Sequence, residues 1–304
     1  MATSGQIDRR ELRNRYELRN RYIFTGQLVM QTALHIGGGR VTLSKSDSPV
    51  VLTPDQKPFI PGSSFKGALR STIEKIVPGL PDFSSCALID LSDEAQKGLT
   101  DKQRESICPT VRQKDIAQLR RGAQARDEAE EIQQKTLKAL CDTCLLFGSP
   151  FAAARLNIND LYMPKEEWNG ILQIRDGVAI DRDSEKAKDR LKYDFEVVPA
   201  SASFDLEIVL ENATSKDLQL VCVGLSEFVH GFGVIGGKRS RGLGVSRLDG
   251  LEVSALELVG EDISEEQRRE NLRNYLVDRT FSSKVDGAAF LKKHINRVFG
   301  VVEE

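Results

Sequence analysis

The sequence has no long apolar run and little net charge. None of its apolar stretches reaches the length of a membrane span, and no hydrophobic segment follows the charged N-terminal residues 1–16. We therefore expect no membrane helix, no secretory signal and a protein that works in the cytoplasm. Lysine and arginine number 43 against 45 acidic residues, a formal net charge of -2. The whole-molecule field therefore does not indicate nucleic acid, and any basic surface must be local.

Cysteine is also scarce. Without a secretion signal, the five cysteines favour reduced thiols or a metal site over a disulfide framework. Four of them lie in the polar, charge-rich segment 78–147, which predicts an insertion rather than core: Cys86, Cys108, Cys141 and Cys144. The C-x-x-C pair places two thiolates on one tight turn, and two more could complete a tetrahedral zinc site that holds the insertion together. Unligated cysteines are the alternative, and a thioredoxin-like pair is disfavoured because no alternating strand and helix units flank it.

The remaining pattern predicts alternating strands and helices. With 304 residues, 40% of them hydrophobic, the chain is long enough for one large domain with insertions or for two small ones. Period-2 alternation predicts a strand from Tyr22 to His35. Helical spacing predicts a helix after Gly62, with Ser63 or Ser64 as N-cap, and others over 124–140 and 217–229, from Ser264 and near Asp286. Cys222 and His294 lie on apolar faces, which indicates burial, and His230 ends a helix.

A glycine turn between the first strand and the first helix suits an anion. Its three glycines, Gly37, Gly38 and Gly39, let backbone N–H groups approach a phosphate closely. His35 stands beside them, as a structural hydrogen-bonding group or a contact to an anion. The polar loop that follows carries Asp47.

The helix after Gly62 adds two cations to this stretch. Lys66 and Arg70 lie near its N-terminal end, where the helix dipole is positive. Together with that end they could grip a phosphate.

Two further segments are basic. Residues 9–22 repeat the hexamer ELRNRY and hold six arginines against two glutamates, which suits RNA contact or a solvated charged arm. In a glycine-rich loop just before a strand, Lys238, Arg239 and Arg241 form a good polyanion-binding design. Glycines 231, 233 and 236 match the dinucleotide fingerprint, but they follow a helix instead of leading from a strand into one, so we reject nicotinamide or flavin binding.

Two outer segments have open roles. Residues 174–204 predict two strands around a long charged excursion, which projects as a hairpin and is either a partner contact or a mobile surface loop. The helical tail after residue 255 either docks against a neighbour or packs back on its own domain.

The motifs LHIGGG, DSPVV, IPGSSFKGALRS, CLLFG and GGKRSRGLG occur in this order over residues 22–250. Together they resemble the RAMP superfamily, in particular the repeated backbone subunit of type III CRISPR-Cas effector complexes. The resemblance implies an α+β fold with an RRM-like (ferredoxin-like) core over 22–254. It also implies a thumb hairpin near 174–204 that intrudes into the guide–target duplex. The arm 1–21, the insertion 78–147 and the helical extension 255–304 lie outside that common core.

The resemblance also implies site residues and partners. Asp47 matches the family's target-cleaving aspartate, and His35 and Lys66 match positions that contact guide RNA, with Arg70 a further candidate. The partners are guide RNA, complementary target RNA and neighbouring effector subunits. With a divalent cation, magnesium or manganese, a carboxylate at Asp47 could help a 2'-hydroxyl attack the adjacent phosphate. Without the resemblance, a loop aspartate is more often a turn former.

Three functions follow as alternatives. The first is a guide-dependent RNA endonuclease, and the second a non-catalytic RNA-binding scaffold of the same complex, in which Asp47 only shapes its loop. The third is a stand-alone guide-processing endonuclease, which is disfavoured because such enzymes usually rely on a catalytic histidine and none of the three histidines is well placed.

Overall fold

The computed structural model describes residues 17–38, 46–89, 98–100, 103, 106–123, 126–164, 166, 168–180, 182–183, 187–260 and 263–301. Most of the basic arm and Gly39 lie outside these residues. Within them, no helix is both long enough and apolar enough to cross a membrane.

An antiparallel sheet organises the chain, in the strand order β10-β9-β1-β7-β3, with β8 paired to β9. The central strand β1 pairs with β7 on one side and with β9 on the other. In the sequence, β7 precedes helix α8 (Ser215–Val229) and β9 follows it. The strands are β1 (Asn20–Met30), β3 (Leu156–Ile158), β7 (Ser203–Glu211), β8 (Gly233–Val234), β9 (Val245–Glu257) and β10 (Ser283–Asp286). The first strand therefore ends at Met30, earlier than the sequence pattern predicts. The strand β10 was not predicted, because its four residues are all exposed and show no alternation.

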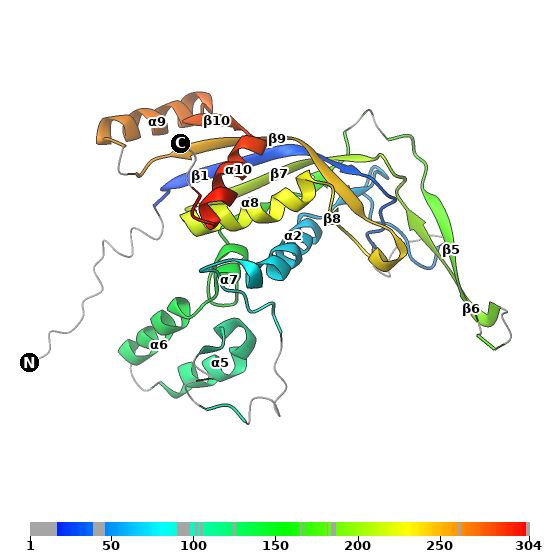
Figure 1. The fold of residues 1–304 in the computed structure, drawn as a ribbon, viewed down its shortest axis with the longest axis horizontal. Helices are drawn as coiled ribbons and strands as arrows, with labels where there is room; N and C mark the ends of the chain where they lie inside the picture. Colours follow the sequence, from blue (N-terminus) through cyan, green and yellow to red (C-terminus); the bar gives the residue numbers. More distant parts are fainter. Residues whose placement is uncertain are drawn as a thin grey trace, which may run out of the picture.

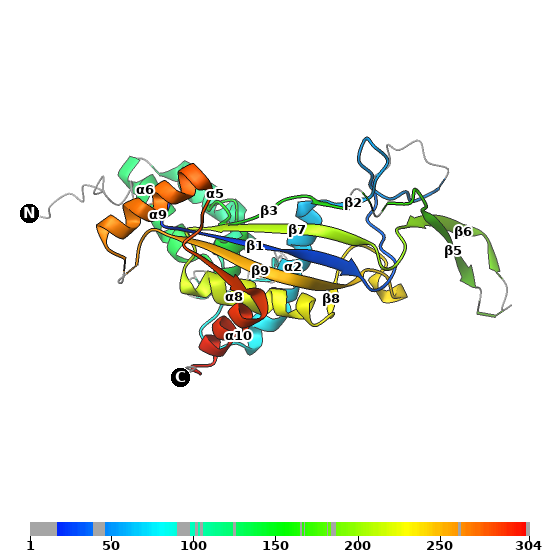
Figure 2. The same cartoon turned by 90° about the horizontal axis from the view of Figure 1, so that it is seen from above.

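Three helices cover one face of this sheet: α2 (Gly62–Ile76), α8 (Ser215–Val229) and α10 (Gly287–Val298) (Figure 1). The opposite face stays largely open (Figure 2). Side chains that alternate along β1 explain this arrangement, since Phe24, Leu28 and Met30 are fully buried under the helices. Phe24 meets Phe290 of α10 edge to face, with 5.8 Å between ring centroids. The C-terminal extension thus packs back on the core, and His294 is buried there as expected.

The start of α2 differs from the prediction. The helix begins at Gly62, so Ser63 and Ser64 lie inside its first turn and neither is the N-cap. The carboxylate of Asp160, far along the chain, accepts a hydrogen bond from the Gly62 N–H at 2.7 Å. The sequence around a helix start does not show whether the capping group comes from another segment, so the N-cap prediction was wrong here. By contrast, α8 has a local capping box of Thr214 and Asp217.

Two segments leave the core. The insertion contains α5 (Gln113–Gly122), α6 (Arg126–Lys138) and α7 (Asp142–Phe147), with the short helices η1 (Val77–Gly79) and η2 (Pro109–Arg112). The predicted helix over 124–140 corresponds to α6. The hairpin of β5 (Gln173–Ile180) and β6 (Ala187–Val197) projects from one end of the molecule (Figure 1). Residues 203 and 204, included in the predicted hairpin segment, belong to core strand β7. Strands β2 (Phe59–Ile60) and β4 (Leu161–Tyr162) form a small separate pair, and α9 (Glu265–Asp278) begins at its predicted cap, Ser264.

The contact between α2 and α8 gives a testable prediction. A Cβ added at Gly224 would lie 2.6 Å from Ile73 and 2.7 Å from Leu69, whereas one at Gly67 would meet nothing within 4 Å. Overpacking should make Gly224→Val less stable by about 1–3 kcal/mol. Gly67→Ala, in an exposed helical position, should add about 1 kcal/mol. Urea unfolding of both variants checks this. Equal stability of Gly224→Val and wild type would contradict the close helix contact.

Candidate nucleic-acid interface and metal centre

His35 joins the glycine turn to the base of the β5–β6 hairpin. Its Nδ1 lies 2.8 Å from the Glu196 carbonyl oxygen, and its Nε2 lies 3.3 Å from Ser48 Oγ. Burial lowers the pKa of His35, and the nearby charge of Lys238 lowers it further. The ring is therefore neutral at pH 7 and acts as a hydrogen-bonded joint between the turn, the Asp47 loop and strand β6.

The Asp47 loop is fastened directly to β6. The Asp47 N–H donates to Asp194 Oδ1 at 2.7 Å, and the Asp194 N–H donates to Asp47 Oδ2 at 3.2 Å. Two residues further on, the Glu196 N–H donates to the Ser48 carbonyl at 3.1 Å, and Glu196 Oε2 accepts from the Val50 N–H at 3.0 Å. The carboxylate of Asp47 is thus held beside the hairpin base, with Oδ1 outside the hydrogen bonds found among the described residues.

The late basic loop meets the same hairpin base. Arg241 Nη1 donates to the Tyr193 hydroxyl, and Lys238 Nζ lies 4.4 Å from the centroid of the Phe195 ring. The loop is also tied to the glycine turn, because the Gly237 N–H donates to the His35 carbonyl at 2.9 Å. Gly236 has φ +82°, and a Cβ there would lie 2.4 Å from that carbonyl oxygen, so only glycine fits.

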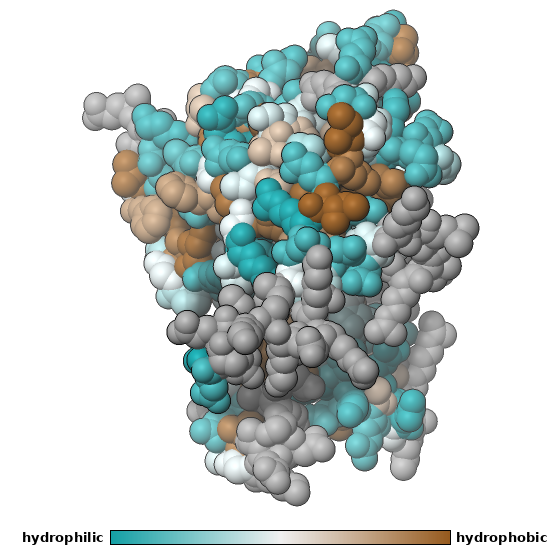
Figure 3. All heavy atoms as spheres, turned by 90° about the vertical axis from the view of Figure 1, so that its right-hand side faces the viewer, coloured by the Kyte–Doolittle hydropathy of each residue, from teal (hydrophilic) through white to brown (hydrophobic). Residues whose placement is uncertain are grey.

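The structure thus brings together His35, Gly37, Asp47, Lys238 and Arg241. Gly37 takes part through its bridge to Val50, and Gly38 donates its N–H to the Pro49 carbonyl at 3.0 Å. Arg239 lies in the same loop, with its Nε donating to the Gly236 carbonyl at 3.0 Å. Figure 3 views this end of the molecule, where hydrophilic side chains surround a smaller apolar group.

Lys66 and Arg70 occupy a different neighbourhood. Lys66 Nζ donates to the Leu156 carbonyl at 2.9 Å, and burial, followed by the charge of Arg70, lowers its pKa. Arg70 Nε donates to Glu74 at 2.7 Å and its Nη2 to Cys144 Sγ at 3.4 Å. No contact found among the described residues joins either side chain to the Asp47 loop. Both predicted RNA contacts are therefore engaged inside the fold.

The described part of the basic arm is also engaged internally. Arg21 pairs with Glu211 at 2.5 Å and donates to the Tyr275 hydroxyl. Tyr22 is buried and donates to Glu257 at 2.6 Å. The last three residues of the second hexamer copy, Asn20 to Tyr22, thus begin β1, while the first copy lies outside the described residues.

The open face of the sheet carries both carboxylates and cations. Glu207 and Glu252 flank Thr25, and Asp205 lies opposite Gln27, all on that face. A hollow of about 490 Å³, lined in part by Gln27 and Trp168, opens near one end of the sheet, and none of the site residues described above lines it. Two cations of the sheet, Arg247 and Lys284, pair with Asp249 and Glu252, so their charge is largely balanced within the chain.

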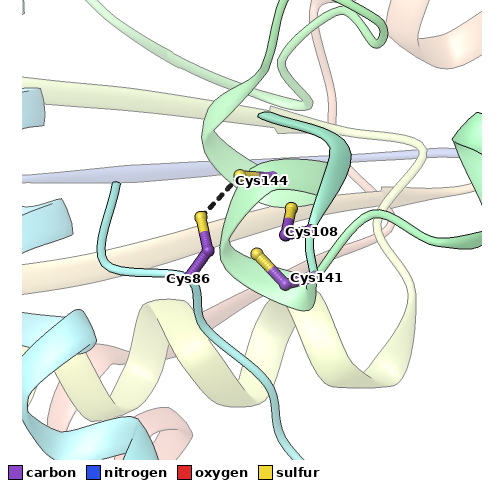
Figure 4. Close-up of side chains that lie close together, drawn as sticks. All are labelled: Cys86, Cys108, Cys141 and Cys144. Carbon is purple, nitrogen blue, oxygen red and sulfur yellow. Dashed lines mark hydrogen bonds between the residues drawn. The ribbon is translucent and has the colours of Figure 1, made fainter. Parts of the chain in front are cut away.

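Four cysteines from the insertion and its borders converge (Figure 4). The sulfur atoms of Cys86, Cys108, Cys141 and Cys144 all lie within 4.8 Å of one another, and Cys86 and Cys144 are 3.6 Å apart. Zinc–sulfur bonds of about 2.3 Å in a tetrahedron place sulfur atoms about 3.8 Å apart, so the arrangement fits. The cluster could hold a metal ion, as the sequence spacing predicts. Cys222 lies apart from it, fully buried in α8.

Sequence reasoning missed the hairpin side of the interface: Tyr193, Asp194, Phe195 and Glu196. Their alternation in KYDFEVV indicates a strand, but nothing in it shows that this strand meets a loop nearly 150 residues earlier. The late basic loop, in contrast, was predicted because its lysine, arginines and glycines form a local sequence pattern.

Comparison with known proteins agrees with the motifs. The family model described as the RAMP superfamily matches residues 27–246. Three relatives are each named CRISPR system Cms endoribonuclease Csm3. The protein from Enterococcus italicus is 39% identical over 90 residues, which cover 27% of this chain and 42% of that protein.

The other two matches are shorter. The Methanothermobacter thermautotrophicus protein is 42% identical over 55 residues, covering 17% of this chain and 22% of the relative. The Streptococcus thermophilus protein is 41% identical over 56 residues, covering 17% and 26%. The chain thus aligns with less than half the length of each of these relatives. The family match, however, covers most of the chain and confirms the resemblance seen in its motifs, so the chain belongs to the RAMP superfamily.

Proposed function

We propose that this protein is a backbone subunit of a type III CRISPR-Cas effector complex, which binds guide RNA and cleaves complementary target RNA with Asp47 as its catalytic residue. One observation carries the proposal: the Asp47 carboxylate, the glycine turn and the cations of the late basic loop all meet at the base of the β5–β6 hairpin. The names of the three relatives, each an endoribonuclease, support the same function.

The topology supports an RRM-like, ferredoxin-like core. Strands β9-β1-β7-β3 are antiparallel neighbours, and the helices α2 and α8 connect β1 to β3 and β7 to β9. In this proposal the projecting β5–β6 hairpin is the thumb that enters the guide–target duplex. Neighbouring backbone subunits and the other proteins of the complex are the protein partners, and the complex works in the cytoplasm.

The distribution of charge supports an RNA path along the hairpin base. Lys238, Arg239 and Arg241 lie there, and lysine and arginine side chains bind phosphate. On the sheet, by contrast, Arg247 and Lys284 are paired with Asp249 and Glu252, which leaves less positive charge for a polyanion. The aromatic ring of Tyr193, half buried under Arg241, is well suited to stack on a base next to the thumb.

Cleavage in this proposal is attack of a 2'-oxygen on the adjacent phosphorus. The 2'-hydroxyl proton passes to the Asp47 carboxylate, the bond to the 5'-oxygen breaks, and the products are a cyclic phosphate and a 5'-hydroxyl that gains a proton from water. Oδ1 of Asp47 and the adjacent Asp194 carboxylate could bind a hard divalent cation, magnesium or manganese. Such ions are commonly held by one or two carboxylates together with phosphate oxygens of the substrate. When bound, such a cation supplies charge stabilisation at the phosphate. The hydrogen bonds to β6 keep Asp47 oriented.

A non-catalytic scaffold of the same complex is the alternative, since the same surface binds RNA without cutting it. A guide-processing enzyme with a catalytic histidine has less support. His35 is buried and neutral, His230 Nδ1 is bonded to the Ser226 carbonyl at 2.7 Å, and His294 is buried, where burial lowers its pKa to about 4.

The first experiment compares wild type with Asp47→Ala in the assembled complex with guide RNA, labelled complementary target and magnesium. We expect the variant to bind target normally and to cleave at least about 100-fold more slowly, because it loses a positioned proton acceptor. Asp205→Ala, which removes an exposed carboxylate from the open sheet face, is the matched control and should cleave like wild type. Normal cleavage by Asp47→Ala would assign the protein to the scaffold role.

The RNA path makes a second prediction. Each phosphate contact to single-stranded RNA contributes about 0.7 to the slope of log affinity against log salt. Replacing both Lys238 and Arg241 with glutamine should therefore reduce that slope by about 1.4. The control replaces Arg247 and Lys284, two exposed cations elsewhere on the sheet, and should leave the slope unchanged. A reversed result would place RNA on the sheet face.

We further propose that the four-cysteine cluster holds a structural zinc ion, which stabilises an insertion with little core of its own. Protein purified with zinc should contain one equivalent, and Cys144→Ser should contain much less. Cys222→Ala, which removes a thiol outside the cluster, should retain the full equivalent. Metal analysis of the three proteins tests this, and equal zinc in wild type and Cys144→Ser would exclude the site.

A further inference from the structure

We propose that Arg70 is the charge-compensating partner of the four-cysteine centre, and that it couples the bound metal to helix α2. This inference rests on the proposed zinc site. A zinc ion with four thiolates carries an excess of two negative charges. Three of the four cysteines are buried, and burying such an excess is costly unless a cation or hydrogen-bond donors stand beside it.

Arg70 is placed to supply that positive charge. Its Nη2 lies 3.4 Å from the sulfur of Cys144, which is fully buried. The Arg70 side chain is only 15% exposed, and its guanidinium stays charged at any ordinary pH. Glu74 holds its Nε at 2.7 Å, and the face of Phe147 lies 5.8 Å from its guanidinium carbon. These contacts orient the second nitrogen toward the sulfur.

Two neutral hydroxyl groups also lie near the sulfurs. Thr143 Oγ1 lies 3.3 Å from Cys141 Sγ. The hydroxyl of Thr110 is buried beside Cys144. Hydroxyl groups of this kind can satisfy sulfur lone pairs, but they bring no positive charge. Arg70 does bring a positive charge, and it contacts a cysteine sulfur of this centre directly.

The same residue connects the centre to the core. Arg70 belongs to α2, whose buried face packs Leu69 and Ile73 against α8 at Gly224. The metal ligands come from outside this helix: Cys86 follows η1, Cys108 precedes η2, and Cys141 and Cys144 lie at the start of α7. The Arg70–Cys144 hydrogen bond thus joins the insertion to a core helix, and by linkage a metal that strengthens it also stabilises α2.

The test uses the full-length chain and metal alone. We expect Arg70→Gln to weaken zinc binding by about 10–100-fold in competition with a chelator, the usual cost of losing a group that supports a metal ligand. In cobalt-substituted protein, loss of the hydrogen bond raises the energy of the sulfur lone pair, so the sulfur-to-cobalt charge-transfer band should move to longer wavelength. A purely structural role for Arg70 would leave that band in place.

Two further variants keep the test decisive. Arg269→Gln is the matched control, because Arg269 also pairs with a glutamate four residues away but is 79% exposed on α9, and it should change neither affinity nor spectrum. Glu74→Gln removes the negative charge beside Arg70 but keeps, in its amide oxygen, an acceptor that can still orient Nε, so zinc affinity should hold or rise. If Glu74→Gln instead weakens zinc as much as Arg70→Gln, the effect comes from helix stability and the proposal falls.

The remaining outcomes separate this inference from the proposals on which it rests. Absence of zinc from the wild-type protein would overturn the metal site itself. Normal zinc affinity in Arg70→Gln, together with weaker binding to guide RNA, would overturn the present inference and return Arg70 to the RNA-binding surface.

Discussion

The pairing of β1 with two strands from the second half of the chain sets the rest of the structure. Arg21 lies opposite Glu211 on one side and Leu256 on the other, and the antiparallel register continues along the strand to Val29 and Met30. The insertion and the projecting hairpin both lie between β1 and β7 in the sequence, so each must leave the sheet and return to it. The sheet fixes the positions of their bases but not those of their outer parts.

The candidate RNA site follows from this constraint. Leu34, just past the end of β1, bridges to Val198, just past the end of β6, so the glycine turn and the hairpin base start side by side. The neighbouring hydrogen bonds of Glu196 and Asp194 then hold the Asp47 loop. A loop fixed at several points to a strand can present a carboxylate in one orientation, which catalysis on a flexible RNA requires.

Sequence alone predicted the elements with strong local patterns: the helix after Gly62, the capped helix over 217–229, the cysteine cluster and the late basic loop. It failed where a distant segment decided the outcome. Asp160 caps α2 instead of a local serine, and Cys144 accepts a hydrogen bond from Arg70, 74 residues earlier in the chain. These partners lie up to about a hundred residues away, beyond the reach of periodicity, and only the fold brings them into contact.

Because the net charge of the chain is small, it matters which individual cations are paired with carboxylates. Many arginines are neutralised within the chain, as Arg21 is by Glu211 and Arg155 by Asp217. Lys238 and Arg241 are held differently, by aromatic rings and a phenol hydroxyl, and no ion pair to a carboxylate is found for either among the described residues. A ring orients a cation without cancelling its charge. The protein can therefore be acidic overall and still offer phosphate a fixed pair of positive charges beside Asp47.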